Sequence, residues 1–281
     1  MERILRRYFP LAVLFQHFPM ACLANIETNI ATDQSALVAF KEHILSDPYL
    51  VLEDNWTANT SVCDWIGVTC GIQHHRVTAL NISFTGLTGS IPPHLGNLYF
   101  LVSLDLSGNN FLENLSRLRR LRSLEIFRHG KIPEVMGDLQ NLRVLNLQYN
   151  PLTGSIPSII FNISALEIIV LSGNNLPGNL PPDMCNDLPS LTGLYLTSNK
   201  FNGQLPSNLT ACSVIQLLSL SSNEFSGQIP TEYGALKKLE GLYLARNSLI
   251  GFCAESVAPV SLRTTVAGIS LFLGHLLILI G

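Results

Sequence analysis

An alternating leucine motif repeats along most of this 281-residue chain. Each copy follows the pattern Leu-x-x-Leu-x-Leu-x-x-Asn-x-Leu, as in LRVLNLQYNPL from residue 142, and the complete copies are mostly 24 residues long. The copies start at Val77, Leu101, Leu121, Leu142, Leu166, Leu191, Ile215 and Leu239. A period of this length indicates a stack of similar units, each contacting only its neighbours. With 47% hydrophobic and 13% charged residues, the chain is too apolar to be disordered.

Each unit contains the signature of one short strand. The Leu-x-Leu alternation, for example Leu145 and Leu147, places alternate side chains in the core and in solvent. Because the same strand recurs in every unit, we expect the strands to form one parallel sheet. A strand this short cannot bury its apolar face alone, so neighbouring units must stack on it.

Two further features of the unit are architectural. An Asn follows each strand, where its amide can satisfy backbone groups that the bend leaves unpaired. A Gly then precedes Ile-Pro or Leu-Pro, and Pro, which lacks a backbone donor, marks a returning segment outside the sheet. The Asn positions are Asn109, Asn150, Asn174, Asn199, Asn223 and Asn247, and the Gly positions are Gly89, Gly130, Gly154, Gly178, Gly203 and Gly227.

The segments LTGSIPPHLGNL and SGQIPTEYGAL resemble the L-x-G-x-I-P signature of plant-specific leucine-rich repeats, as in receptor-like kinases and receptor-like proteins. The preceding TDQSALVAFKEHILSDP and NWTANTSVCDWIGVTC are similar to the N-terminal cap of that family. The resemblance covers residues 32–251. It implies an α/β solenoid, a right-handed superhelix with a parallel concave sheet and a helical N-terminal cap.

The cap is expected to begin with a helix. Leu37, Phe40 and Ile44 share one helical face, and Thr32 or Asp33 can cap the helix start. The resemblance to the family also implies a capping disulfide between Cys63 and Cys70. A metal site at this cysteine pair lacks a second ligand pair nearby, and we expect His74 and His75 to be solvated loop residues.

The chain divides into four expected parts: a signal peptide over 1–24, the cap over 25–76, about eight repeats over 77–251, two of them shortened, and a hydrophobic tail over 252–281. The basic start, apolar run and small residue at Ala24 are typical of secretory signals. Secretion implies an oxidising compartment, in which cysteines pair. Six sequons fit a secreted or cell-surface glycoprotein: Asn55, Asn59, Asn81, Asn114, Asn162 and Asn208.

The array departs from the family pattern in two places. Between Leu101 and Leu142 lie 41 residues, where two 24-residue copies need 48. The basic run RLRRLR at 117–122 is consistent with a polyanion site or with two short repeats sharing a tight edge. The tail has three open interpretations: a short or tilted membrane anchor, a lipid-anchor signal, and the end of a truncated gene product. Beyond the cap pair, Cys185, Cys212 and Cys253 leave an odd thiol.

Outward strand residues of successive repeats form a continuous surface that core packing does not constrain. Aromatic and Arg side chains anchor interfaces, which favours a protein or peptide ligand, although an ordinary solvated sheet face is the alternative. The candidate ligand-binding residues are Arg122, Glu125, Phe127, Arg143, Asn146, Gln148, Tyr149, Tyr195, Tyr243 and Arg246. Asn81 also points outward, so a glycan there would obstruct a ligand.

The sequence predicts a binding protein. No Ser/His/Asp, Cys/His or carboxylate cluster and no kinase motif supports catalysis, and we expect no cofactor, no metal and no nucleic-acid partner at a net charge of −3. The resemblance implies an extracellular recognition module for a peptide, microbial molecule or co-receptor kinase, in defence or developmental signalling. The alternatives are a secreted inhibitor of an extracellular enzyme, similar to polygalacturonase inhibitors, and a truncated receptor-kinase product.

Overall fold

The structure is a computed structural model that describes residues 29–112, 115–126 and 130–250. The expected signal peptide at 1–24, the tail at 252–281 and Cys253 lie outside the described residues. Within the described ranges, no helix is both long and apolar enough to cross a bilayer.

The N-terminal cap contains two helices, α1 (Ile30–Glu42) and α2 (Val51–Asn55), a 3₁₀ turn η1 (Val62–Asp64), and a short strand β1 (Ile44–Ser46). The expectation that Thr32 or Asp33 caps α1 was wrong in its position. The N-cap is Asn29, whose side chain accepts from the Thr32 amide, while the Thr32 hydroxyl accepts from the Asn29 amide. Ile44 was also misplaced, because α1 ends at Glu42.

Asp33 instead joins the cap to the first repeat. Its carboxylate accepts hydrogen bonds from Arg76 Nε at 2.8 Å and Nη2 at 2.6 Å, and from the Val77 amide at 3.0 Å. Both charged side chains are buried, with exposures of 0% for Asp33 and 7% for Arg76. A bidentate geometry and a third donor compensate the carboxylate for lost hydration. This pair fixes α1 against the start of the repeat array.

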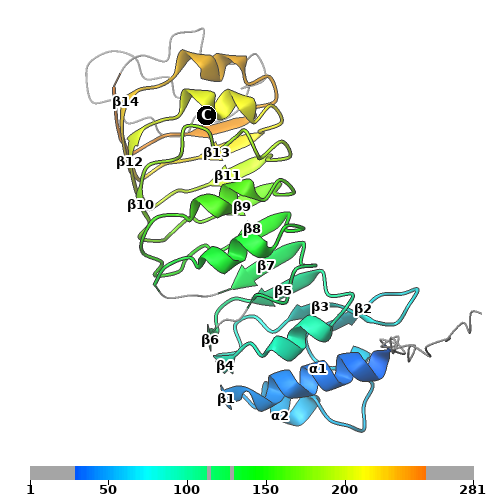
Figure 1. The fold of residues 1–281 in the computed structure, drawn as a ribbon. Coiled ribbons are helices and arrows are strands. Elements are labelled where there is room, and N and C mark those ends of the chain that lie inside the picture. The colour runs from blue at the N-terminus through cyan, green and yellow to red at the C-terminus, as the bar shows by residue number, and fades with distance from the viewer. Residues whose placement is uncertain (1–28, 113–114, 127–129, 251–281) are drawn as a thin grey trace, which may run out of the picture.

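The repeats stack their strands into one nine-stranded sheet with the order β15-β13-β11-β9-β8-β7-β5-β3-β2. All neighbours are parallel except β2, which pairs with β3 antiparallel. Its strands are β2 (Val68–Cys70), β3 (Val77–Asn81), β5 (Ser103–Leu106), β7 (Ser123–Ile126), β8 (Val144–Asn146), β9 (Ile168–Val170), β11 (Gly193–Tyr195), β13 (Leu217–Ser219) and β15 (Gly241–Tyr243). Figure 1 shows them rising from the cap, one above the next. We call the solvent side of this sheet the concave face.

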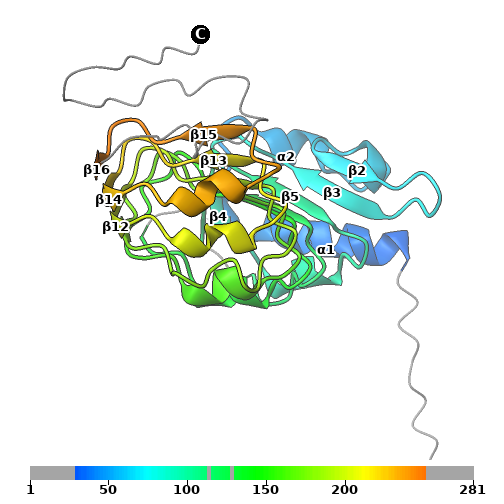
Figure 2. The ribbon, with the colours of Figure 1, turned by 90° about the horizontal axis from the view of Figure 1, so that it is seen from above.

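A second set of short strands runs along another side of the stack (Figures 1 and 2). These strands are β4 (Thr88–Ser90), β6 (Asn110–Leu112), β10 (Pro177–Gly178), β12 (Lys200–Gln204), β14 (Glu224–Gln228) and β16 (Ser248–Ile250). Single-turn 3₁₀ helices return the chain opposite the main sheet: η2 (Pro93–Asn97), η3 (Glu134–Asp138), η4 (Ser158–Asn162), η5 (Ser207–Ala211) and η6 (Thr231–Ala235). Each begins after a Pro that serves as its N-cap.

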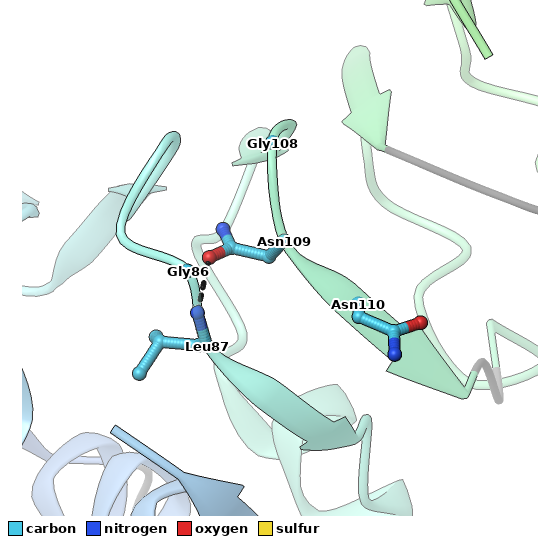
Figure 3. Close-up of a pocket in the computed structure, with 5 residues that line it drawn as sticks. All are labelled: Gly86, Leu87, Gly108, Asn109 and Asn110. Atoms are coloured by element: carbon cyan, nitrogen blue, oxygen red, sulfur yellow. Dashed lines mark hydrogen bonds between the residues drawn. The ribbon is translucent and has the colours of Figure 1, made fainter. Parts of the chain in front are cut away.

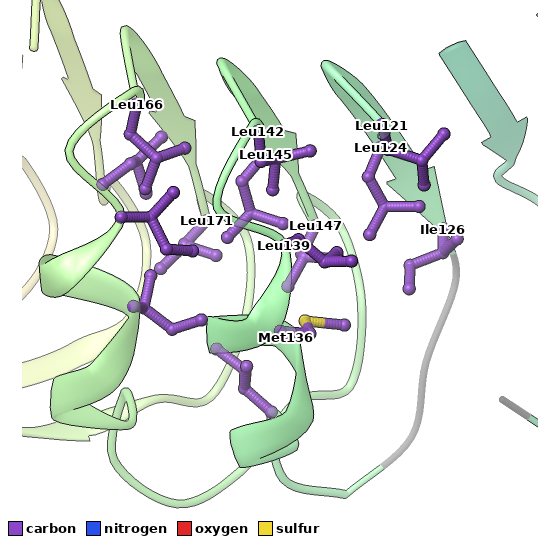
Figure 4. Packing of buried hydrophobic residues seen from close by; sticks show 14 of the residues in the cluster. Leu121, Leu124, Ile126, Met136, Leu139, Leu142, Leu145, Leu147, Leu166 and Leu171 are labelled. Carbon is purple, nitrogen blue, oxygen red and sulfur yellow. The ribbon is translucent and has the colours of Figure 1, made fainter. Parts of the chain in front are cut away.

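The motif leucines fill the space between sheet and turns (Figure 4). Leu145 and Leu147 are fully buried and face Met136 and Leu139. Met136 lies in η3, and Leu139 directly follows it. The same arrangement recurs in each rung, so the core is one continuous column. The repeat pattern therefore predicted the strands and their buried face correctly.

The shortened copies interrupt only the second set of strands. In the main sheet, β7 pairs in register with β5 and β8. The second set is split into β4-β6, which β1 of the cap extends through its pairing with β4, and β10-β12-β14-β16. Between these two groups the structure describes one isolated bridge, from Gly130 to Leu152. The missing residues thus come from the outer loops, while the strand and its core leucines are retained.

The Asn positions form the expected ladder. Asn109 Oδ1 accepts from the Leu87 amide of the preceding repeat at 2.8 Å (Figure 3), and its Nδ2 donates to the carbonyls of Ile82 and Leu106. Comparable bonds are made by Asn174, Asn199, Asn223 and Asn247. In the first repeat, Thr85 occupies this place and donates its hydroxyl to the Ile82 carbonyl. Each amide therefore ties one repeat to the repeat before it.

Two disulfides are present in the described part of the chain. Cys63 and Cys70 are bonded in the cap, the pair that the family resemblance implies. Cys185 and Cys212 form a second, buried bond between two consecutive returning segments. Sequence spacing alone left the partners of these two cysteines open. The second disulfide closes a sequence separation of 27 residues and staples adjacent repeats together.

Candidate functional site

The concave face consists of the residues that alternate with the buried leucines in each strand. Strand register places these residues side by side in rows across the sheet. The central row runs Asn81, Asp105, Glu125, Asn146, Val170, Tyr195, Ser219 and Tyr243. The row changes character along its length, from polar and acidic near the cap to apolar and aromatic beyond β8.

The acidic part of the face is centred on Glu125. Asp105 lies beside it on β5, and Asn146 on β8 donates its amide to the Glu125 carboxylate at 2.9 Å. Partial burial raises the pKa of Glu125, and the neighbouring negative charge of Asp105 raises it further. The Asn146 hydrogen bond acts in the opposite direction. Two adjacent carboxylates on an open sheet favour a cationic group of a ligand.

The apolar part of the face lies over β8 to β15. Tyr195 and Tyr243 occupy equivalent positions two repeats apart, with Ser219 between them in register. In each case a Gly stands two residues earlier on the same strand. A Cβ on Gly193 would lie 2.7 Å from the Tyr195 ring, and a Cβ on Gly241 would lie 3.0 Å from the Tyr243 ring. Both rings therefore lie over the glycines, in space that a larger side chain would occupy.

Aliphatic side chains complete this apolar part. They share partial exposure and occupy outward positions of the same strands: Val144, Ile168, Val170 and Leu217. They are absent from the predicted binding residues, which are all aromatic, charged or amide-bearing. The repeat pattern could have identified them, because they occupy the outward positions directly before and after the central buried residue of each strand.

The other candidate residues lie around these two parts. Arg143 forms an exposed ion pair with Glu167 at 3.0 Å, and Arg122 is exposed directly before strand β7. Gln148 donates its backbone amide to the Asn146 side chain. Tyr149 is 75% exposed, has a φ of 55°, and lies against Gly173 of the next repeat. Arg246 adopts the same left-handed backbone, and Phe127 lies outside the described residues.

The sequons are distributed over several surfaces. Asn59, Asn81 and Asn162 are exposed, whereas Asn55 and Asn208 are half-buried and donate their side-chain amides within the protein. Asn114 is outside the described residues. Asn81 Oδ1 accepts from the amide and hydroxyl of Ser83. A glycan on Asn81 would stand at the cap end of the concave face, away from the two tyrosines.

A shallow hollow of about 260 Å³ lies at the turns that follow β3 and β5 (Figure 3). Gly86, Leu87, Gly108, Asn109 and Asn110 line it. Its polar groups are mostly those that the Asn ladder already uses. Among the residues described by the structure, no three His, Cys, Asp or Glu side chains gather as a metal site would require.

Comparison with known families supports this description. A model described as the leucine rich repeat N-terminal domain matches residues 30–71, and leucine rich repeat models match 76–98 and 140–201. A putative receptor-like protein kinase of Arabidopsis thaliana is 37% identical over 111 residues, which are 40% of this chain and 11% of the kinase. A polygalacturonase inhibitor of Vitis vinifera is 30% identical over 117 residues, 42% of this chain and 29% of the inhibitor.

Solved structures show the same likeness. The ectodomain of the Arabidopsis thaliana receptor kinase GASSHO1/SCHENGEN3, in complex with CASPARIAN STRIP INTEGRITY FACTOR 2, has a TM-score of 0.66 and 35% identity over 78% of this chain and 27% of that chain. The Arabidopsis receptor kinase HAESA, in complex with the peptide hormone IDA and the co-receptor SERK1, has a TM-score of 0.67 and 29% identity over 80% of this chain and 43% of that chain. The chain spans about a tenth of the length of the receptor kinase it matches in sequence.

Proposed function

Since this chain belongs to the plant leucine-rich-repeat receptor-like ectodomains, we propose that it is an extracellular recognition module that binds a peptide on its concave face. The observation that carries this proposal is the two-part central row. Its apolar part offers tyrosine rings and aliphatic side chains that no core packing requires, and its acidic part offers two adjacent carboxylates.

A ligand that fits both parts is an extended peptide with apolar side chains and one cationic group. Tyr195 and Tyr243 would pack against the apolar side chains, and Glu125 with Asp105 would hold the cation. The solved ectodomains of HAESA and GASSHO1/SCHENGEN3 were each determined with a peptide hormone or an integrity factor, which supports the choice of a peptide. A co-receptor kinase would bind the exposed margins of the same face.

The biological setting follows from this role. We infer secretion through the segment at 1–24, glycosylation at the exposed sequons, and either release or membrane attachment through 252–281. The domain limits of the cap (25–76) and the repeats (77–251) remain part of the proposal. The role is one of binding, and no step of catalysis is assigned to this chain.

A linear peptide library displayed on phage tests the proposal. The full chain, purified from a secretory host, is used for selection, and enriched peptides are then measured against two variants. In the test variant, Tyr195→Ser and Tyr243→Ser remove the two rings of the apolar part. In the matched control, Tyr49→Ser and Ile72→Ser remove two side chains that are 73% and 93% exposed on other surfaces.

We expect enriched peptides to be apolar with a Lys or Arg, and the test variant to lose at least about tenfold in affinity while the control is unchanged. Equal binding by wild type and test variant would refute the concave face as the binding site. A lack of enrichment, together with inhibition of a fungal polygalacturonase by the purified chain, would favour the inhibitor function instead.

A further inference from the structure

A cluster of arginines lies on the edge of the solenoid, outside the central row of the concave face. Arg117, Arg119, Arg120 and Arg122 are all exposed, and Arg143 is exposed directly before the neighbouring strand β8. The Arg143 amide donates to the Arg122 carbonyl at 2.8 Å, which places these two residues side by side. We call the five residues the arginine edge.

The fold does not require this charge. In the loop before β7, the buried residues are Leu115, Leu118 and Leu121, which fill the core column. The residues between them face solvent, and in the neighbouring repeats these places hold different side chains. The repeat before has Asn97, Tyr99 and Phe100, and the repeat after has Asp138, Gln140 and Asn141. Among the described repeats, this one alone has Arg at all three places, Arg117, Arg119 and Arg120, and a further Arg, Arg122, directly before its strand.

Little of the positive charge is neutralised within the protein. Arg143 pairs with Glu167, and Asp138 stands in the next repeat at the place equivalent to Arg117. Within the described ranges, no carboxylate lies within ion-pair distance of Arg117, Arg119, Arg120 or Arg122. The edge therefore keeps a net positive charge of about three, which attracts an anion over a Debye length of roughly 8 Å at physiological salt.

Aromatic rings continue the edge towards the cap. The Arg120 guanidinium lies 3.8 Å from the centre of the Tyr99 ring, and Tyr99 packs edge-on against Phe100. Phe100 in turn stacks on His74 at 4.2 Å between ring centres. The stack holds Arg120 in one orientation and leaves its N–H groups free for bidentate hydrogen bonds. As expected, His74 is an exposed loop residue, and its ring also belongs to this stack.

We propose that the arginine edge, with Tyr99, binds an acidic polysaccharide built from uronate sugars. Guanidinium groups pair with carboxylates in a bidentate manner, and aromatic rings pack against the apolar faces of pyranose rings. The five arginines are all exposed, which suits a polymer that spreads several weak contacts over a long chain. A single sulfate or phosphate group is bound better in an enclosed pocket, where several donors converge on it, than on an exposed edge.

The probe is polygalacturonate of defined length, with its fully methyl-esterified form as a control. Esterification leaves the sugar backbone in place and removes the carboxylate charges. The full chain is measured by calorimetry at low and physiological salt. Polygalacturonate is expected to bind, to weaken as salt rises, and to lose binding on esterification.

Two charge-matched variants locate the site. The test variant carries Arg119→Gln, Arg120→Gln and Arg122→Gln. The control carries Lys131→Gln, Lys200→Gln and Lys238→Gln, which removes the same charge from three exposed positions elsewhere. We expect affinity to fall roughly tenfold or more in the test variant and to change less than about twofold in the control. A separate Tyr99→Ala variant keeps every charge and should weaken binding about threefold.

Three results would overturn the proposal. Equal losses in both charge variants would indicate attraction by net charge alone, and equal binding of the esterified polymer would exclude carboxylate recognition. Binding of a tyrosine-sulfated peptide in preference to polygalacturonate, lost in the same test variant, would reassign the edge to a peptide. Since all the replaced side chains are exposed, unchanged circular dichroism and melting temperature show that a loss of binding is not a loss of fold.

Discussion

The Asn ladder makes a quantitative prediction at Asn223. Its Oδ1 accepts from the buried Phe201 amide at 3.0 Å, and its Nδ2 donates to the carbonyls of Leu196, Leu220 and Ser221. The carbonyls have other donors: Asn199 for the first, Asn247 for the second and the Ser198 amide for the third. Asn223→Ala therefore leaves the Phe201 amide as the one group without its partner.

An unsatisfied buried amide costs about 1–3 kcal/mol, and the lost packing of a side chain that is 8% exposed adds to it. We expect Asn223→Ala to lower the free energy of unfolding by about 2–3 kcal/mol. Urea titration followed by far-UV circular dichroism measures it, with Asn202→Ala, on the partly exposed strand β12, as the control. The comparison requires equal m-values, because repeat arrays can lose cooperativity.

A second substitution at the same position tests the direction of the hydrogen bonds. Asn223→Asp keeps the acceptor for Phe201 but places a carboxylate against the carbonyl oxygens. Burial and this repulsion should raise the pKa of the new acid, so its ionisation destabilises the fold at neutral pH and the loss shrinks as pH falls through that pKa. A loss below about 0.5 kcal/mol for Asn223→Ala, or a pH-independent loss for Asn223→Asp, would refute the ladder as a source of stability.

Three further outcomes follow from the described contacts. Replacing Cys185 and Cys212 together by Ala should cost about 3.5 kcal/mol, the chain-entropy value for a loop of this length, measured by urea titration of both forms. Asp33→Asn should cost about 3 kcal/mol or more, since it leaves Arg76 buried without its counter-charge, and a loss below about 1 kcal/mol would contradict that account. Glu125→Gln should raise the melting temperature near neutral pH. The pKa of Glu125 is raised in the folded protein, so the ionised carboxylate destabilises the fold. In acid the carboxylate is protonated and this destabilisation is lost, so the gain from Glu125→Gln should vanish there.

The repeat pattern was sufficient to predict the stack of parallel strands, the buried leucines and the Asn ladder. Each of these features depends on contacts between residues at fixed offsets, one repeat apart. The shortened copies did not disturb the prediction, since β7 keeps its core leucines and its register. The resemblance implied the Cys63–Cys70 disulfide because both cysteines lie within the quoted cap segment.

Sequence reasoning was less accurate wherever partners are far apart in the chain. Asp33 has the local character of a helix cap, but its partner, Arg76, lies 43 residues later, and Asn29 caps the helix instead. Cys185 and Cys212 come together only because consecutive returning segments stack. The concave-face candidates were drawn from aromatic, charged and amide residues, so the aliphatic positions Val170 and Leu217 were not recognised before the register was known.

The sequence by itself therefore determined the architecture, because a short period repeated many times leaves one way to bury every leucine. Only the tertiary structure decided which surface residues act together. The division of the concave face into acidic and apolar parts, and the stack of Arg120 on Tyr99, arise between neighbouring rungs. Such contacts depend on register and on side-chain orientation. Solvent-facing positions carry no packing constraint that would reveal either one from the sequence alone.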